Sequence, residues 1–132
     1  MAKHTAIALS ALTLCWGGSV HAATLASAPN YGGVTIANSG GTVTCRLFNA
    51  GSGTAQITTR QIIANSGAAI TPTVNTCASS LALNTACEFS APIPGNLALS
   101  CRVTYNGAGA ALRGVTEVTD IAGDILNDVL MQ

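Results

Sequence analysis

The chain of 132 residues is predicted to fold as an all-β sandwich, specifically an immunoglobulin-like sandwich of about seven strands. Two observations predict this fold. Short runs of β-branched and apolar residues recur at intervals of roughly ten residues, with Gly- and Asn-rich turns between them. Helical periodicity is absent except near the C-terminus, so nothing in the main part of the chain competes with the strand pattern.

Turn residues divide the chain into seven candidate strands. They are residues 33–37, 42–48, 55–64, 69–74, 87–93, 97–105 and 112–119. Side chains along a strand alternate between its two sides, and this pattern is clearest in residues 42–48. One side carries Val43, Cys45 and Leu47, and the other carries Thr44, Arg46 and Phe48. Pro72 interrupts residues 69–74, and proline donates no ladder hydrogen bond, so we expect that strand at a sheet edge.

Residues 1–22 are predicted to be a secretory signal segment. A short basic start precedes an apolar run that ends at Trp16, and Val20 and Ala22 stand at positions −3 and −1 of the cleavage site. The run is shorter than the roughly 20 residues of a membrane span. We therefore expect a secreted or periplasmic mature chain without a membrane span. Lipidation at Cys15 is the weaker alternative, because the residue before it is large.

The cysteines that follow the signal segment are interpreted as a disulfide framework, because an oxidising compartment favours paired thiols. Four cysteines allow three pairings, of which we favour Cys77–Cys87 and Cys45–Cys101. The first bridge closes a short loop worth about 3 kcal/mol of stability, and the second a longer loop worth about 4. A zinc site is disfavoured, because Cys-x-x-Cys is absent and no histidine follows residue 22. No cofactor and no metal are expected.

The composition of residues 23–132 argues against several functions. Its charged side chains are four arginines and five acids, a formal net charge of −1, and no lysine or histidine remains. No base is then present to activate a serine, and the thiols are expected to be paired, so we expect no enzyme. Nucleic acid is not an expected partner, because the chain has no basic patch and few aromatic residues.

Residues 120–132 are predicted to form a tail after the sandwich domain of residues 23–119. Its apolar residues recur at helix-like spacing and predict a short helix, which Gly123 weakens. These residues are Ile121, Ile125, Leu126, Val129 and Leu130. The acids Asp120, Asp124 and Asp128 are interpreted as a solvated face, since their spacing does not match a calcium-binding loop. A carboxylate pair for glycoside hydrolysis is a lesser alternative.

Three arginines are candidate interface residues. Arg46 and Arg102 each follow a cysteine of the predicted Cys45–Cys101 bridge, so they point outward from the two sheets if those cysteines point inward. Arg113 lies in the last predicted strand. Arginine is enriched at protein interfaces, which favours a recognition role. The alternative is that these side chains only keep the surface soluble.

Two segments carry a resemblance to a known family. TVTCRLFNAGSGTAQITT (42–59) and VNTCASSLALNTACEFSAPI (74–93) are similar to the ASH-type, Hydin-like immunoglobulin-like domains of secreted bacterial proteins. The cysteine-loop-cysteine part is the most specific, and Pro92 departs from the Phe-x-Pro that usually follows in the family. The resemblance implies a sandwich with a binding or structural role and carries no catalytic residue. We expect Leu81 and Leu83 of the loop to reach the rim of the core.

Two functions are consistent with these features. The first is a monomeric accessory domain that recognises another protein or a surface glycan through its loops or an edge strand. The alternative is a structural subunit that polymerises, as pilins do, by lending a strand to a neighbour's sheet. The low charge and the N-terminal stretch ATLASAPNYGG (23–33), which we expect to be free to extend, favour the alternative. We rank it second, because the stretch is a poor apolar donor.

Overall fold

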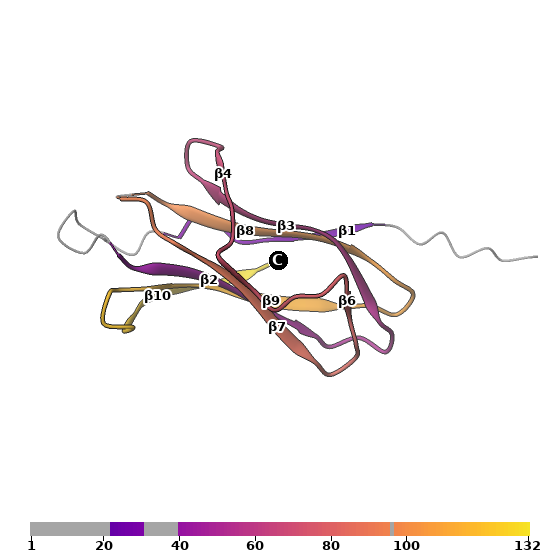
Figure 1. Ribbon diagram of the computed structural model, residues 1–132. Helices are drawn as coiled ribbons and strands as arrows, with labels where there is room; N and C mark the ends of the chain where they lie inside the picture. Colours follow the sequence, from indigo (N-terminus) through magenta and orange to yellow (C-terminus); the bar gives the residue numbers. More distant parts are fainter. Residues whose placement is uncertain (1–21, 31–39, 96) are drawn as a thin grey trace, which may run out of the picture.

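The computed structural model describes residues 22–30, 40–95 and 97–132, which form a two-sheet β-sandwich (Figure 1). These residues contain ten strands and no helix. The predicted fold class is therefore confirmed. The predicted signal segment, up to residue 21, and the predicted strand at 33–37 lie outside the described residues.

Both sheets are antiparallel, and each contains long strands whose inward side chains form the core. The β8 sheet has the order β1-β8-β3-β4, with β6 also paired to β3. Its strands are β1 (Ala23–Ala26), β8 (Leu99–Asn106), β3 (Ala55–Ala64), β4 (Ala69–Ile70) and β6 (Ser80–Leu81). The β2 sheet has the order β10-β9-β2-β7-β5. Its strands are β10 (Ile125–Met131), β9 (Leu112–Thr119), β2 (Thr42–Asn49), β7 (Ala86–Pro92) and β5 (Val74–Asn75).

The core lies between the sheets and follows from the alternation of side chains along the long strands. Five predicted strands match β2, β3, β7, β8 and β9 to within two residues at each end. Phe89 of β7 is the largest of the fully buried side chains. The other large ones are aliphatic, namely Leu47, Ile62, Leu99, Val43, Val103 and Val118. The sequence pattern thus places one apolar side of each strand against the opposite sheet.

A disulfide joins the two sheets through the middle of the core. Cys45 of β2 and Cys101 of β8 are both fully buried, and their Cα atoms lie 5.8 Å apart. The predicted Cys45–Cys101 pairing is therefore confirmed. It fixes which side of β2 and which side of β8 face inward.

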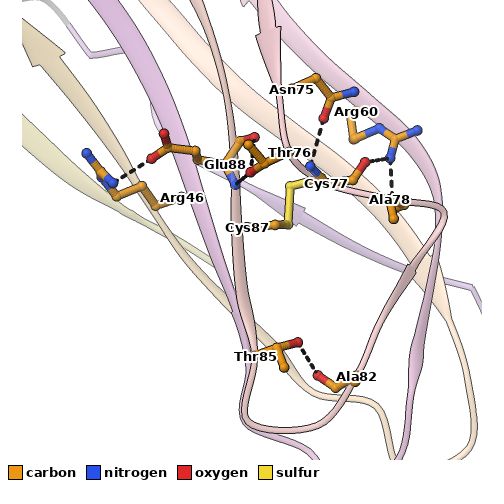
Figure 2. The surroundings of a disulfide bond; sticks show 10 residues. All are labelled: Arg46, Arg60, Asn75, Thr76, Cys77, Ala78, Ala82, Thr85, Cys87 and Glu88. Carbon is orange, nitrogen blue, oxygen red and sulfur yellow. Dashed lines mark hydrogen bonds and ion pairs between the residues drawn. A yellow bond between two sulfur atoms is a disulfide. The ribbon is translucent and has the colours of Figure 1, made fainter.

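The second predicted bridge, Cys77–Cys87, ties the preceding loop to the start of β7 (Figure 2). Arg60 of β3 holds the same loop, because its Nη1 donates to the carbonyl oxygen of Cys77 and to the next carbonyl along the chain. Leu81 is buried, as expected, but Leu83 is 49% exposed. The expectation for Leu83 was wrong because this residue lies in a turn at the tip of the loop.

The C-terminal tail corrects a prediction, because residues 125–131 form β10 and not a helix. β10 pairs antiparallel with β9, so it satisfies a strand edge that would otherwise be bare. Met131 is buried opposite Gly114, whose missing side chain leaves room for the sulfur. The turn before β10 is shaped by Asp120, whose Oδ1 accepts hydrogen bonds from the amides of Ala122 and Asp124.

The predicted strand at 69–74 is divided between the two sheets. β4 pairs with β3, whereas β5 pairs with β7. Pro72 lies between them, where its missing N–H costs no ladder hydrogen bond. The segment therefore crosses from one sheet to the other and adds a short edge strand to each.

The N-terminal stretch is also different from the expectation that it is free to extend. β1 pairs with β8 along its full length, and Leu25 is buried. At the end of β1, Ala26 exchanges two backbone hydrogen bonds with Gln132, of 2.9 and 2.8 Å, and the next residue, Ser27, forms a β-bridge with Met131. The start of the described chain thus links the β8 sheet to the end of β10 (Figure 1).

The buried side-chain amide of Asn49 connects β6 with two loops at one end of the sandwich. Asn49, fully buried, donates through Nδ2 to the carbonyl oxygens of Gly53 and Leu81, at 2.8 and 3.0 Å. Its Oδ1 accepts from the amides of Gly51 and Ala111, at 3.1 and 3.4 Å. A Cβ at Gly51 would lie 2.1 Å from a backbone oxygen of the loop after β8, so this close approach requires glycine.

The two bridges are predicted to contribute unequally to stability. We expect Cys45→Ala/Cys101→Ala to lower the free energy of unfolding by about 4 kcal/mol and Cys77→Ala/Cys87→Ala by about 3, because the first bridge closes the longer loop. Urea denaturation of both double variants, compared with the oxidised protein, measures the difference. A larger loss from the second pair would contradict the central role of the Cys45–Cys101 bridge.

Asn49→Ala is expected to destabilise the domain by roughly 1–3 kcal/mol, because it leaves buried and partly buried backbone groups of β6 and two loops without their side-chain partner. Asn30→Ala is the matched control. Asn30 is equally buried, but its Oδ1 has no partner among the described residues, and its Nδ2 makes bonds of 3.1 and 3.4 Å. Thermal unfolding of both variants checks the order, and an equal or greater loss from Asn30→Ala would refute the role assigned to Asn49.

Candidate functional site

The outer face of the β2 sheet carries the candidate site, because strand register brings outward side chains of β2, β7, β9 and β10 into three rows. The first row is Ala86, Phe48 and Arg113. The second row is Glu88, Arg46, Val115 and Leu130. The third row is Thr44, Glu117 and Asp128. These side chains alternate with the buried ones, so the core and the site are opposite sides of the same strands.

Arg46 lies between two carboxylates from the neighbouring strands. Its Nε donates to Glu117 Oε2 at 2.7 Å, and its Nη1 donates to Glu88 Oε2 at 2.5 Å (Figure 2 shows the second contact). The hydrogen bond to Glu117 is the main cause that raises the pKa of Arg46 above its ordinary value. Partial burial acts in the opposite direction, and the charges of both carboxylates add to the increase. The guanidinium stays charged and is held between the two carboxylates.

A shallow apolar groove of about 310 Å³ lies beside this ion cluster. Its apolar side chains are Phe48, Ala86, Val115 and Leu130. Phe48 is 41% exposed and Leu130 is 67% exposed, although both are large hydrophobic residues. Arg113 also lines the groove, and among the described residues it forms no salt bridge. Exposed apolar side chains with a charged rim are typical of interaction sites.

A second hollow, of about 250 Å³, adjoins the ion cluster on the side of β7. It is lined by Arg46, Thr76, Ala86, Cys87 and Glu88. Thr76 forms part of the wall, because its Oγ1 donates to the carbonyl oxygen of Glu88 and accepts from the Glu88 amide, at 3.1 and 2.9 Å (Figure 2). The Cys77–Cys87 bridge therefore supports the edge of the candidate face as well as the loop.

The structure brings two of the three predicted arginines onto one face. Arg46 and Arg113 lie on the outer face of the β2 sheet, whereas Arg102 lies on β8, between Ala26 and Gln61 in the other sheet. Arg46 and Arg102 are both exposed, as the inward direction of the Cys45–Cys101 bridge predicts. The three arginines therefore do not form a single site.

Sequence reasoning missed the residues that complete the face. Phe48 was placed on the same side of its strand as Arg46, which is the signal that identifies it. Glu88 and Glu117 lie 42 and 71 positions from Arg46 in the chain, so no local pattern connects them. Leu130 was assigned to a helix, and its place opposite Val115 depends on β10 being a strand.

The described residues hold no group of three or more His, Cys, Asp or Glu side chains arranged to bind a metal. Asp120 uses its carboxylate within the turn before β10. In the same part of the chain, no helix has the length and apolar character of a membrane span.

No protein-family model, curated protein or solved structure matches this chain. The function proposed below therefore rests on the fold and on the geometry of this face.

Arg46→Gln is expected to lower the free energy of unfolding by less than about 1 kcal/mol, because the Arg46 side chain itself is 53% exposed. The difference should shrink in about 1 M salt, where the Debye length is roughly 3 Å. Denaturation at low and high salt measures it. Arg102→Gln, on the other sheet, is the control and should change stability by no more than about 0.5 kcal/mol. A salt-independent loss of several kcal/mol from Arg46→Gln would mean that Arg46 holds the fold together.

Proposed function

We propose that this chain is a secreted or periplasmic, non-catalytic recognition domain that binds a protein partner through the outer face of the β2 sheet. The observation that carries the proposal is the apolar groove. Phe48 and Leu130 expose large apolar surfaces to solvent there, directly beside Arg113. Burying these surfaces against a partner removes them from water, which is the main driving force of association.

The shape of the groove favours a protein over a small molecule. Small ligands bind in concave pockets that enclose most of their surface. This groove instead lies open on an exposed sheet face, and its volume of about 310 Å³ is small. An apolar centre with charged residues at the rim matches the usual anatomy of a protein interface.

Both disulfides support a compartment outside the cytoplasm. Cys45–Cys101 and Cys77–Cys87 are each formed, and such bridges persist where the environment is oxidising. The prediction that residues 1–22 are a signal segment points in the same direction. The resemblance to secreted ASH-type domains stays a prediction and agrees with this compartment.

The site's chemistry supports binding without catalysis. Residues 23–132 contain no histidine or lysine, so no side chain that titrates near neutral pH is available as a general base. The cysteines are paired, and the carboxylates of Glu88 and Glu117 are engaged with Arg46. Polymerisation by strand exchange ranks second, because β1 already pairs with β8 in its own domain.

A photo-reactive phenylalanine analogue at position 48 is expected to crosslink the chain to a protein partner in the cell that produces it. Position 48 suits the probe, because the native residue is aromatic and 41% exposed. Adding Arg113→Glu should greatly reduce the adduct. Denaturing electrophoresis and mass spectrometry of the adduct give the readout.

The same probe at position 102, on the outer face of the β8 sheet, is the matched control and should give no adduct. Equal crosslinking from both positions, or crosslinking from position 102 alone, would show that the β2 sheet does not carry the binding face.

A further inference from the structure

The sign of the charge changes along the candidate face, from basic at one end to acidic at the other. The first row ends in the basic Arg113, and the third contains the acidic Glu117 and Asp128. The second row contains the apolar Val115 and Leu130 beside the mutually paired Arg46 and Glu88. On β9, Val115 lies two residues from Arg113 and two residues from Glu117. The strand rise places each charge about 7 Å from Val115, in opposite directions.

The two ends of this face each carry a charge without an ion-pair partner. Asp128 lies directly opposite Glu117, and like charges in this position repel. Arg46 forms a salt bridge with Glu117, with 2.7 Å between Nε and Oε2, whereas Asp128 has no salt bridge among the described residues. At the other end, Arg113 lies opposite Phe48, which offers it no carboxylate.

Two copies of the chain can face each other across a two-fold axis that lies parallel to the face. The charges at both ends of the face are then paired. If the axis runs at right angles to β9 and passes over Val115, the first row of one copy lies over the third row of the other. Arg113 of each copy then meets Glu117 and Asp128 of its partner. Val115 and Leu130 meet their own equivalents along the axis. Arg46 and Glu88, which share this row, also meet their equivalents, but their charges are already paired within each copy. Sheets packed in this aligned way lie roughly 10 Å apart, a distance that the long charged side chains bridge.

From this self-complementary pattern we infer that the protein partner of the face is a second copy of this chain. The inference rests on the proposed function and names its partner, so the domain recognises its own kind. A partner with a uniformly acidic or uniformly basic surface pairs with one end of the face and repels the other. A second copy in reversed orientation pairs with both ends.

The size of the face predicts a weak dimer. Strand geometry gives the three rows an area of about 15 by 15 Å, which is small for a stable interface. The dimer should therefore form and dissociate with concentration. Charge reversals are a sensitive test of such an interface, because like charges brought together across it are strongly unfavourable.

The test is sedimentation velocity of the oxidised protein over a wide range of concentrations, with Arg113→Glu and Asp128→Arg as single variants. The unaltered protein should dimerise as its concentration rises. Each single variant should show a dissociation constant about tenfold higher or more, because each places like charges opposite one another twice in the dimer. Both positions are exposed, so folding should be preserved.

Mixing the two single variants supplies the decisive result. In the mixed pair the reversed charge of each copy faces the reversed charge of the other, so a heterodimer should form where neither variant dimerises alone. Arg102→Glu, on the opposite face, is the control and should dimerise like the unaltered protein. A dimer that is insensitive to the reversals, or reversals that are not rescued by mixing, would overturn the inference.

The outcomes also separate this inference from the proposed function. A chain that stays monomeric, yet crosslinks from position 48 to a different protein, would overturn the second copy as partner and leave the binding face in place. A monomer without any crosslink from position 48 would contradict both.

Discussion

The Cys45–Cys101 bridge is the constraint on which the rest of the structure depends. It joins β2 and β8 through the buried space between the sheets, so it fixes the side of each strand that faces the core. A shift of one residue along β2 would turn its whole outer row inward, because strand side chains alternate. The bridge thereby determines that Arg46 and Phe48 point outward. The core and the candidate face are opposite sides of the same strands, and the bridge locks which side faces inward.

This division of β2 explains how a chain with so few charges presents a defined surface. The flanking strands each supply a carboxylate to Arg46, which holds its guanidinium in place. The apolar side chains beside it remain uncovered, although burying them would be favourable. A monomer gains nothing from keeping Leu130 in water. The arrangement is understandable if the exposed face is used for contact with another molecule.

Much of the fold could be predicted because its determinants are local. Alternation in residues 42–48 placed Cys45 and Arg46 on opposite sides of the strand, and the predicted disulfide pairing is the one that forms. The tail was predicted wrongly, since the spacing of Leu126 and Leu130 suits a helix and the competing factor was the distant edge of β9. The ion cluster could not be predicted for the same reason. Glu117 reaches Arg46 only after two strands far apart in sequence have paired.

The pairing of the described chain's first and last segments has a consequence for how the domain is made. Ala26 bonds to Gln132, roughly a hundred positions later, and β1 pairs with β8 across most of the sequence. The sandwich therefore cannot close until the segment up to residue 132 is in place. Contacts this distant also slow folding, since a long loop must be ordered before they form. Until that last segment arrives, β1 and β10 lack the backbone contacts that join the two sheets at this point.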